Sequence, residues 1–273
     1  MTFEEFLAGA TPRILIEVTR TRGSTPRETG AFMLVAADSL WGTIGGGHME
    51  FDAVDAARAM LVDGRAVVSL DVTLGPDSGQ CCGGRVELRL SRANEHVVQA
   101  LRDRLAVEAD SNPAVYIFGS GHVGRALALA LAPLPFNVTV VETRQEELDL
   151  LDPRIARRLE SMPESVVTDI PEGGMALIMT HDHALDFLIG AEALKRSDLR
   201  YVGMIGSRTK RGVFAGWLRD SGFDADRLQR LVLPIGSASV KDKRPAVIAA
   251  LVAAELLSAC LGSSGQGQAT IVG

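Results

Sequence analysis

The feature that most constrains the fold of this chain is a glycine-rich turn between two apolar segments. Residues 119–124 read Gly-Ser-Gly-His-Val-Gly and directly follow the apolar run Ala114–Phe118. A second apolar run, residues 137–141, leads to Glu142, which lies 18 residues after the last glycine of the turn. This spacing is typical of a strand–turn–helix–strand unit that binds a dinucleotide, with the acid on a ribose hydroxyl. Each of the three glycines has an expected role. Gly119 permits the tight turn, Gly121 lets a phosphate approach the backbone, and Gly124 lets the helix pack closely on the strand.

The rest of the second half of the chain alternates strands and helices. Apolar runs at residues 176–179 and 201–205 predict two further buried parallel strands. Helices are expected at residues 123–132, 145–151, 184–195, 209–220 and 243–258. This order predicts an α/β fold over residues 111–273, a Rossmann-like doubly wound parallel sheet with helices on both faces. A Rossmann-like turn that binds no nucleotide is the alternative to a ligand site.

The first half of the chain has a less regular pattern. Its strands are expected at residues 13–18, 31–36, 66–72 and 85–90, and its helices at residues 49–62 and 96–107. Residues 20–27 read as a loop by composition. This mixture predicts a smaller N-terminal α+β domain over residues 1–110, because the polar stretch 108–113 ends in a proline and separates the two patterns.

The composition excludes several classes of protein. A net charge of −6 over 273 residues argues against a nucleic-acid partner, which needs a basic surface. The longest apolar run, residues 246–254, is about half the length of a membrane span, so we expect no membrane insertion. The acidic start MTFEEFLAGA has no basic and then apolar stretch, so we expect no signal peptide. Three cysteines cannot form a disulfide framework, which favours a reducing, cytoplasmic location.

A run of three glycines marks a possible anion site in the first half. Gly45, Gly46 and Gly47 precede His48 and the helix expected from residue 49. Successive glycines allow the backbone amides to form a concave nest that binds an oxyanion. A flexible turn is the alternative interpretation.

A basic helix start marks a second possible anion site. Ser207 follows the strand at residues 201–205 and is a good N-cap, while Arg208 and Lys210 follow in the first turn. Cations are unfavourable at the positive end of a helix unless an anion is bound there. The alternative is a solvated basic face.

Two histidines flank an aspartate after the strand at residues 176–179. His181 and His183 could ligate a metal at the carboxyl end of the sheet, where ligands of such folds bind. Two histidines are fewer than the three or four ligands of a zinc site. Asp182 is also suited to cap the helix that follows.

The adjacent thiols Cys81 and Cys82 stand in the string Gln-Cys-Cys-Gly-Gly at residues 80–84. Thiolates bind soft metals and can carry transferable sulfur. A redox-active pair and two inert buried thiols are the alternatives. Cys260 lies in an apolar helical segment and reads as a core residue.

Taken together, these motifs resemble the XdhC/CoxI family, accessory proteins for molybdenum hydroxylases such as xanthine dehydrogenase. The matching stretches keep their order over nearly the whole chain and are residues 22–27, 42–47, 80–84, 119–125, 180–186 and 201–211. The resemblance implies a chaperone that binds molybdenum cofactor (molybdopterin, in its mononucleotide or dinucleotide form) while a cysteine desulfurase sulfurates it. Delivery to the client hydroxylase would follow. It also implies a homodimer, and an accessory protein rather than an enzyme.

The resemblance also implies which residues meet the cofactor. Two of them, Cys81 and Cys82, would contact molybdenum. The remaining candidates lie in the glycine turns and polar motifs and are Gly45, Gly46, Gly47, His48, Gly119, Gly121, His122, Gly124, Glu142, His181, Asp182, His183, Ser207, Arg208 and Lys210.

Two other functions compete with the chaperone. One is an NAD(P)-dependent oxidoreductase, with the nucleotide on the turn and Glu142 and with His181 or His183 as the acid–base group. The other is a redox sensor that uses the two adjacent thiols. Residues 237–244 depart from the family pattern, which has a glycine-rich loop with few charges, so the contacts of this loop and the identity of the client enzyme stay open.

Overall fold

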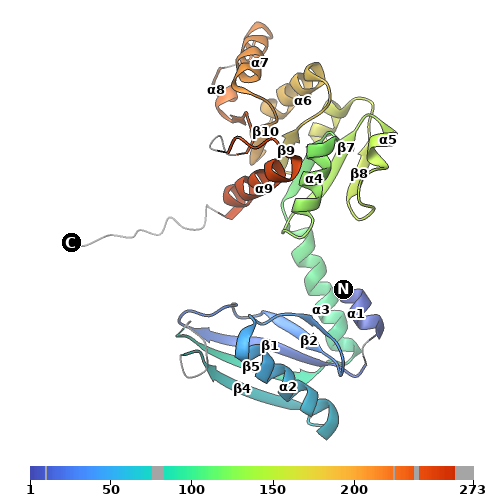
Figure 1. The fold of residues 1–273 in the computed structure, drawn as a ribbon, viewed down its shortest axis with the longest axis vertical. Coiled ribbons are helices and arrows are strands. Elements are labelled where there is room, and N and C mark those ends of the chain that lie inside the picture. Colours follow the sequence, from blue (N-terminus) through green and yellow to red (C-terminus); the bar gives the residue numbers. More distant parts are fainter. Residues whose placement is uncertain (10, 76–82, 224, 237–239, 262–273) are drawn as a thin grey trace, which may run out of the picture. The chain divides into compact units, whose positions relative to one another are not determined.

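The chain folds into two compact units, residues 1–105 and 106–273 (Figure 1). The structure is a computed structural model that describes residues 1–9, 11–75, 83–223, 225–236 and 240–261. The helix α3 (Glu95–Asp110) runs past the point of division. Residues 108–110, expected in a linker, therefore form the last turn of a helix.

The first unit is an antiparallel sheet with helices on both faces (Figure 1). Its strands pair in the order β3-β2-β1-β5-β4. They are β1 (Ile14–Arg22), β2 (Phe32–Val35), β3 (Leu40–Gly42), β4 (Val67–Thr73) and β5 (Arg85–Arg92). The helix α2 (Gly47–Asp63) packs on one face, while α1 (Phe3–Gly9) and α3 pack on the other. Alternate residues of β1 supply the two cores, since Ile14 and Ile16 face α2 and Leu15 faces the opposite side.

The strand β1 corrects one expectation from composition. Residues 20–22 were expected in a loop, but β1 continues through them because its partner strand β5 pairs with it as far as Arg22 and Arg85. Most side chains at this end of β1 are exposed, so their polar character is compatible with a strand. Backbone pairing with a neighbour outweighs the loop-like composition here.

The second unit confirms the expected doubly wound sheet. Six strands run parallel in the order β11-β10-β9-β6-β7-β8, which is the order 3-2-1-4-5-6 of a Rossmann fold read from the other edge. The strands are β6 (Ala114–Phe118), β7 (Asn137–Glu142), β8 (Ala156–Leu159), β9 (Met175–Ile178), β10 (Tyr201–Met204) and β11 (Leu231–Val232).

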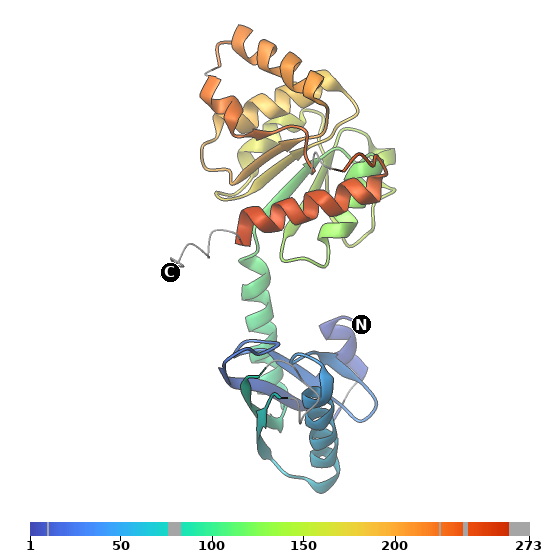
Figure 2. The ribbon, with the colours of Figure 1, turned by 60° about the vertical axis from the view of Figure 1, so that its left-hand side comes forward.

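Helices cover both faces of this parallel sheet. One face carries α4 (His122–Leu131), α5 (Gln145–Leu148) and α9 (Pro245–Leu261), and Figure 2 shows α9 in red lying beside α4 in green. The other face carries η2 (Pro163–Asp169), α6 (His183–Lys195) and α7 (Arg208–Asp220), with the short α8 (Ala225–Gln229) after them. Ile117 belongs to the first core and its neighbour Phe118 to the second. Burial on both faces explains why these strands are apolar without alternation.

The apolar run of α9 is used for packing within this unit. Val252 and Leu256 are fully buried in the core that α9 shares with α4. Among the residues that the structure describes, no helix is both long and apolar enough to span a membrane.

Candidate functional site

The glycine-rich turn joins β6 to α4 at the carboxyl edge of the parallel sheet. Gly119 has φ +115°, and a side-chain β-carbon there would lie 2.4 Å from the carbonyl oxygen of Met179. A β-carbon on Gly124 would lie 2.0 Å from the carbonyl oxygen of Gly119. Gly121, the N-cap of α4, has nothing within 4 Å of that position. The turn is therefore closed at its first and third glycines and open at its second, where a ligand could approach the backbone.

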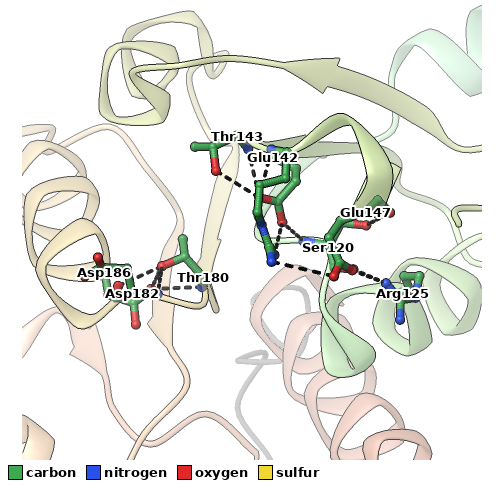
Figure 3. Close-up of polar contacts among 9 residues, drawn as sticks. Ser120, Arg125, Glu142, Thr143, Glu147, Thr180, Asp182 and Asp186 are labelled. Atoms are coloured by element: carbon green, nitrogen blue, oxygen red, sulfur yellow. Dashed lines mark hydrogen bonds and ion pairs between the residues drawn. The ribbon is translucent and has the colours of Figure 1, made fainter. Parts of the chain in front are cut away.

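Glu142 is buried at the end of β7, next to the turn, and its carboxylate accepts hydrogen bonds from this chain (Figure 3). The amide of Ser120, inside the turn, donates to Oε2 at 2.9 Å. The amide of Thr143 donates to Oε1 at 2.9 Å, and the guanidinium of Arg144 donates to both oxygens at 3.2 Å. We expected the carboxylate of Glu142 to bind a ribose hydroxyl. In the structure it is hydrogen-bonded within the chain, where it holds the glycine-rich turn against β7.

These contacts set the ionisation of Glu142. Burial raises the pKa of its carboxyl group, but the hydrogen bonds from Arg144 and from the amides of Ser120 and Thr143 outweigh burial and lower the pKa to about 2. Glu142 is therefore a carboxylate at every physiological pH.

A second set of contacts fixes the same turn from α5. The hydroxyl of Ser120 donates to the carbonyl oxygen of Glu147 at 2.9 Å. Arg125, on α4, pairs with the carboxylate of Glu147 at 2.5 Å and donates to the carbonyl of Ser120 at 2.6 Å (Figure 3). The backbone of the turn is preorganised by these contacts before any ligand binds.

The stretch Thr180 to His183 follows β9 along the same edge. Asp182 is the N-cap of α6, and its carboxylate accepts the amide of Ala184 at 2.6 Å, as the capping alternative predicted. His181 and His183 are exposed. No group of three side chains suited to a metal ion occurs within the described ranges. The observed role of this stretch is to start α6.

Lys210 differs from its expected role as an anion contact. Its ammonium group is buried, pairs with the fully buried carboxylate of Asp186, and donates to the carbonyl of Ile205 at 3.0 Å. The other oxygen of Asp186 accepts the amide and the hydroxyl of Thr180 at 2.9 and 2.8 Å. The ammonium group of Lys210 therefore joins α7 to α6. Ser207 caps α7, accepting the amide of Lys210 at 3.2 Å, while Arg208 is exposed.

The glycine run of the first unit already holds a carboxylate of its own chain. Oε2 of Glu50, in the first turn of α2, accepts the amides of Ile44 and Gly46 at 2.9 and 3.0 Å and the hydroxyl of Thr43 at 2.5 Å. Burial raises the pKa of Glu50, and these donors outweigh burial and lower it. Of the three glycines expected to form a nest, Gly46 therefore donates to a carboxylate of its own chain, while the amide of Gly45 donates to the hydroxyl of Thr43 at 3.0 Å. His48 is exposed at the start of α2.

Three motifs of the first unit meet at the loop that follows β1. A β-carbon on Gly45 would lie 2.5 Å from the ring of Pro26, and one on Gly84 would lie 2.2 Å from the carbonyl oxygen of Ser24. The loop therefore lies between the glycine run and the segment that enters β5. Cys81 and Cys82 lie outside the described residues, in the connection between β4 and β5 whose last glycine is Gly84.

Sequence reasoning missed three residues that organise these sites: Glu50, Arg144 and Asp186. Glu50 and Asp186 carry the usual sequence signal of an acid in the first turn of a helix. Arg144 had a weaker sequence signal. It lies two residues after Glu142, near enough along the chain for its guanidinium to reach that carboxylate.

Comparison with known families and proteins gives a consistent result. Residues 115–256 match the family model described as the XdhC Rossmann domain, and residues 6–71 match the XdhC and CoxI family. The uncharacterized protein YqeB of Escherichia coli K12 is 30% identical over 260 residues, which are 90% of this chain and 43% of YqeB. The chain thus spans less than half the length of that relative.

A solved structure shares the fold of the whole chain. It is a Bacillus halodurans protein described as a xanthine dehydrogenase, with a TM-score of 0.77 and 18% identity over 97% of this chain and 96% of that one.

Proposed function

The chain belongs to the XdhC and CoxI family, and from this membership we propose that it binds molybdenum cofactor, holds it for sulfuration and delivers it to a xanthine dehydrogenase-type hydroxylase. The observation that carries the proposal is the match of both units to models of the one family, with the Rossmann model alone covering more than half of the chain. In this role the chain is an accessory protein of the hydroxylase.

The residues of the glycine-rich turn fit the phosphate of such a cofactor. Gly121 leaves the backbone open, and α4 begins there with no acidic residue in its first turn. The amides of His122 and its neighbours would donate to phosphate oxygens, with support from the helix dipole. Glu142 would keep the turn rigid through the amide of Ser120. The cofactor supplies the redox chemistry of the client enzyme, while this chain supplies binding and protection.

We propose Cys81 and Cys82 for the molybdenum end of the cofactor. Thiolates are suited to a soft metal and to sulfur transfer. The segment that follows them is held at Gly84 against the loop after β1. The proposal also includes two protein partners, a cysteine desulfurase and the client hydroxylase, and a homodimeric state that sedimentation would measure.

The test of cofactor binding is co-expression with a complete molybdenum-cofactor pathway, followed by purification. Metal analysis and the fluorescence of the oxidised pterin should find one molybdenum and one pterin per chain. Absence of both from such preparations would end the proposal. NADH or NADPH added to the purified protein should bind at most weakly, and tight binding with hydride transfer would favour the oxidoreductase instead.

Gly121→Asp is a sharp variant for the same experiment. A β-carbon at this N-cap position meets nothing within 4 Å, and an aspartate there can cap α4, so the fold should be retained. Its negative charge would repel a phosphate at the turn, and cofactor content should fall by about tenfold or more. Gly216→Asp, at a glycine of α7 where a β-carbon also meets nothing within 4 Å, is the matched control and should keep its cofactor.

The thiols are tested separately by replacing both cysteines with alanine. The double variant Cys81→Ala/Cys82→Ala should lose sulfuration of the cofactor that it carries, measured as cyanide-releasable sulfur. If sulfur transfer is unchanged in the double variant, the thiols have no part in the mechanism.

A further inference from the structure

A cleft opens in the Rossmann unit at the carboxyl ends of β10 and β11. Its volume is about 580 Å³, within the range of small-molecule sites. Apolar side chains contribute part of its lining, among them Ile205, Ile235, Ile248 and Leu251. The loop after β11 is fixed at one wall, because the amide of Gly236 donates to Glu255 of α9 at 2.9 Å.

Three cations line the same cleft. They are Arg208 from the start of α7 and Lys241 and Lys243 from the segment before α9. All three are exposed, and none has an ion-pair partner within the part of the chain that the structure describes. The one acid of the lining, Asp242, is already paired with Arg244 at 2.6 Å. The cleft therefore presents unneutralised positive charge beside an apolar surface.

The helices α7 and α9 begin at the cleft, and their positive ends make the three nearby cations unfavourable unless an anion is bound there. Neither α7 nor α9 has an acidic residue in its first turn, whereas α2 and α6 each have one and α5 has two. Cations beside the positive ends of two helices repel those dipoles. An anion in the cleft would remove the repulsion, and the apolar lining would accept a flat ring attached to that anion.

We propose that this cleft binds a planar heterocycle that carries a phosphate, with Arg208, Lys241 and Lys243 on the phosphate and the isoleucines against the ring. This gives a role to the two lysines of the segment before α9, Lys241 and Lys243. The inference rests on the proposed function, because molybdenum cofactor contains a phosphorylated heterocycle. The strand β10 is two strands from β6, about 10 Å at ordinary strand spacing, so the cleft is distinct from the glycine turn and within reach of the same extended ligand.

The test uses the purified full chain and two fluorescent or calorimetric titrations. One probe is neopterin monophosphate and the other is cytidine monophosphate, which distinguish a pterin from a nucleotide source of the same chemistry. Each is paired with its unphosphorylated form. Lys241→Gln/Lys243→Gln should weaken binding of the preferred phosphate-bearing probe by about tenfold or more, because charged contacts to the phosphate are lost.

Arg200→Gln/Arg219→Gln is the matched control. Both arginines are exposed, and they lie before β10 and in the last turn of α7, at the opposite ends of the elements that form the cleft. This variant has the same change in charge and should bind like the wild type. Tighter binding of either probe would support the cleft as a binding site. The probe that binds more tightly would show whether the natural ligand is a pterin or a nucleotide.

Two results would overturn the inference. One is that neither phosphate-bearing probe binds the wild type at concentrations up to about 1 mM. The other is that both double variants bind alike. These outcomes are separate from the molybdenum experiment: probe binding that depends on the lysines, in a protein that never retains molybdenum, would sustain the cleft and reject the chaperone. Molybdenum retention without probe binding would sustain the chaperone and reject the cleft.

Discussion

At the scale of single residues, two internal carboxylates organise the glycine-rich loops. Glu50 accepts the amides of Ile44 and Gly46 in the first unit, and Glu142 accepts the amide of Ser120 in the Rossmann turn. Each carboxylate satisfies donors that would otherwise need water or a ligand. Glycine loops are often flexible, but these two are held by charge-assisted hydrogen bonds. A ligand of the Rossmann turn would therefore meet a preformed loop, with open backbone at Gly121.

The low pKa of Glu142 predicts a specific dependence of stability on pH. The pKa is lowered from an ordinary 4.5 to about 2 in the folded chain, so the folded state favours the ionised form. The stabilisation is complete above the unfolded pKa and is lost as the pH falls toward 2. Its size is about 3 kcal/mol at neutral pH. Glu142→Gln should therefore lower the free energy of unfolding by about that amount at pH 7, and the difference from wild type should shrink between pH 4.5 and pH 2.

Urea unfolding of wild type and variant across this pH range measures the difference. Glu146→Gln, an exposed neighbour on α5, is the control and should follow the wild type within about 0.5 kcal/mol. A difference between wild type and Glu142→Gln that stays constant from pH 7 to pH 2 would show that ionisation of Glu142 does not carry the effect.

Sequence patterns predicted backbone roles at this scale better than they predicted side-chain partners. The tight positions Gly119 and Gly124 and the open position Gly121 follow from a local motif, because a turn is defined by adjacent residues. The pairing of Lys210 with Asp186 does not, since the two residues are 24 positions apart and meet only when β9 and β10 become neighbours. A basic residue in the first turn of a helix gives the same local sequence pattern whether it binds a ligand or pairs with a buried acid. The pattern alone therefore could not distinguish the two roles of Lys210.

At the scale of elements, one buried ion pair joins α6 and α7 at the carboxyl edge of the sheet. Asp186 is fully buried on α6, Lys210 is nearly so on α7, and their remaining hydrogen bonds go to Thr180 and Ile205 after β9 and β10. The pair therefore sets how the two helix starts lie above their strands. Ser207 and Arg208, which begin α7 beside the proposed cleft, depend on that placement.

Removing one member of the pair should destabilise the Rossmann unit strongly. Asp186→Ala leaves the ammonium of Lys210 buried without its carboxylate, which costs about 3–5 kcal/mol of unfolding free energy. Glu192→Ala removes the partner of Lys195 in an exposed pair of the same helix and should cost at most about 1 kcal/mol. Denaturant unfolding of both variants tests the contrast. Equal small losses would mean that the Asp186 pair contributes no more than a surface contact.

The elements that sequence patterns missed are short, polar or at the edge of a sheet. The strand β11 has two residues and β8 reads Ala-Arg-Arg-Leu at an edge, so neither has the apolar run that marks the inner strands. The extra length of β1 depends on pairing with β5, which lies far along the chain. By contrast, β6 was placed correctly at both ends because it is buried on both faces and is followed directly by a glycine turn.

At the scale of the whole molecule, each unit has what it needs to fold by itself. The two hydrophobic cores of the first unit contain no residue of the Rossmann sheet, and the reverse also holds for the described residues. Family models match the two units separately, at residues 6–71 and 115–256. We therefore expect two unfolding transitions, one for each unit.

The two tryptophans of the chain allow each transition to be observed alone. Trp41 packs against Phe3 and Phe32 in the first unit, and Trp217 stacks on Phe214 in the second. Trp217→Phe leaves a reporter of the first unit, and Trp41→Phe leaves a reporter of the second. Fluorescence-detected urea unfolding of these two proteins gives the baseline for each unit.

A core truncation in one unit should then move only that unit's reporter. Ile16→Ala removes a fully buried side chain of the first unit and should lower the stability seen by Trp41 by about 2–5 kcal/mol, with no change at Trp217. Ile117→Ala, the matched truncation in the Rossmann sheet, should do the opposite. If either variant shifts both reporters together, the units unfold as one cooperative structure. In that case a ligand held by the Rossmann turn would also stabilise the unit that carries Cys81 and Cys82, since binding to a cooperative native state raises the stability of all of it.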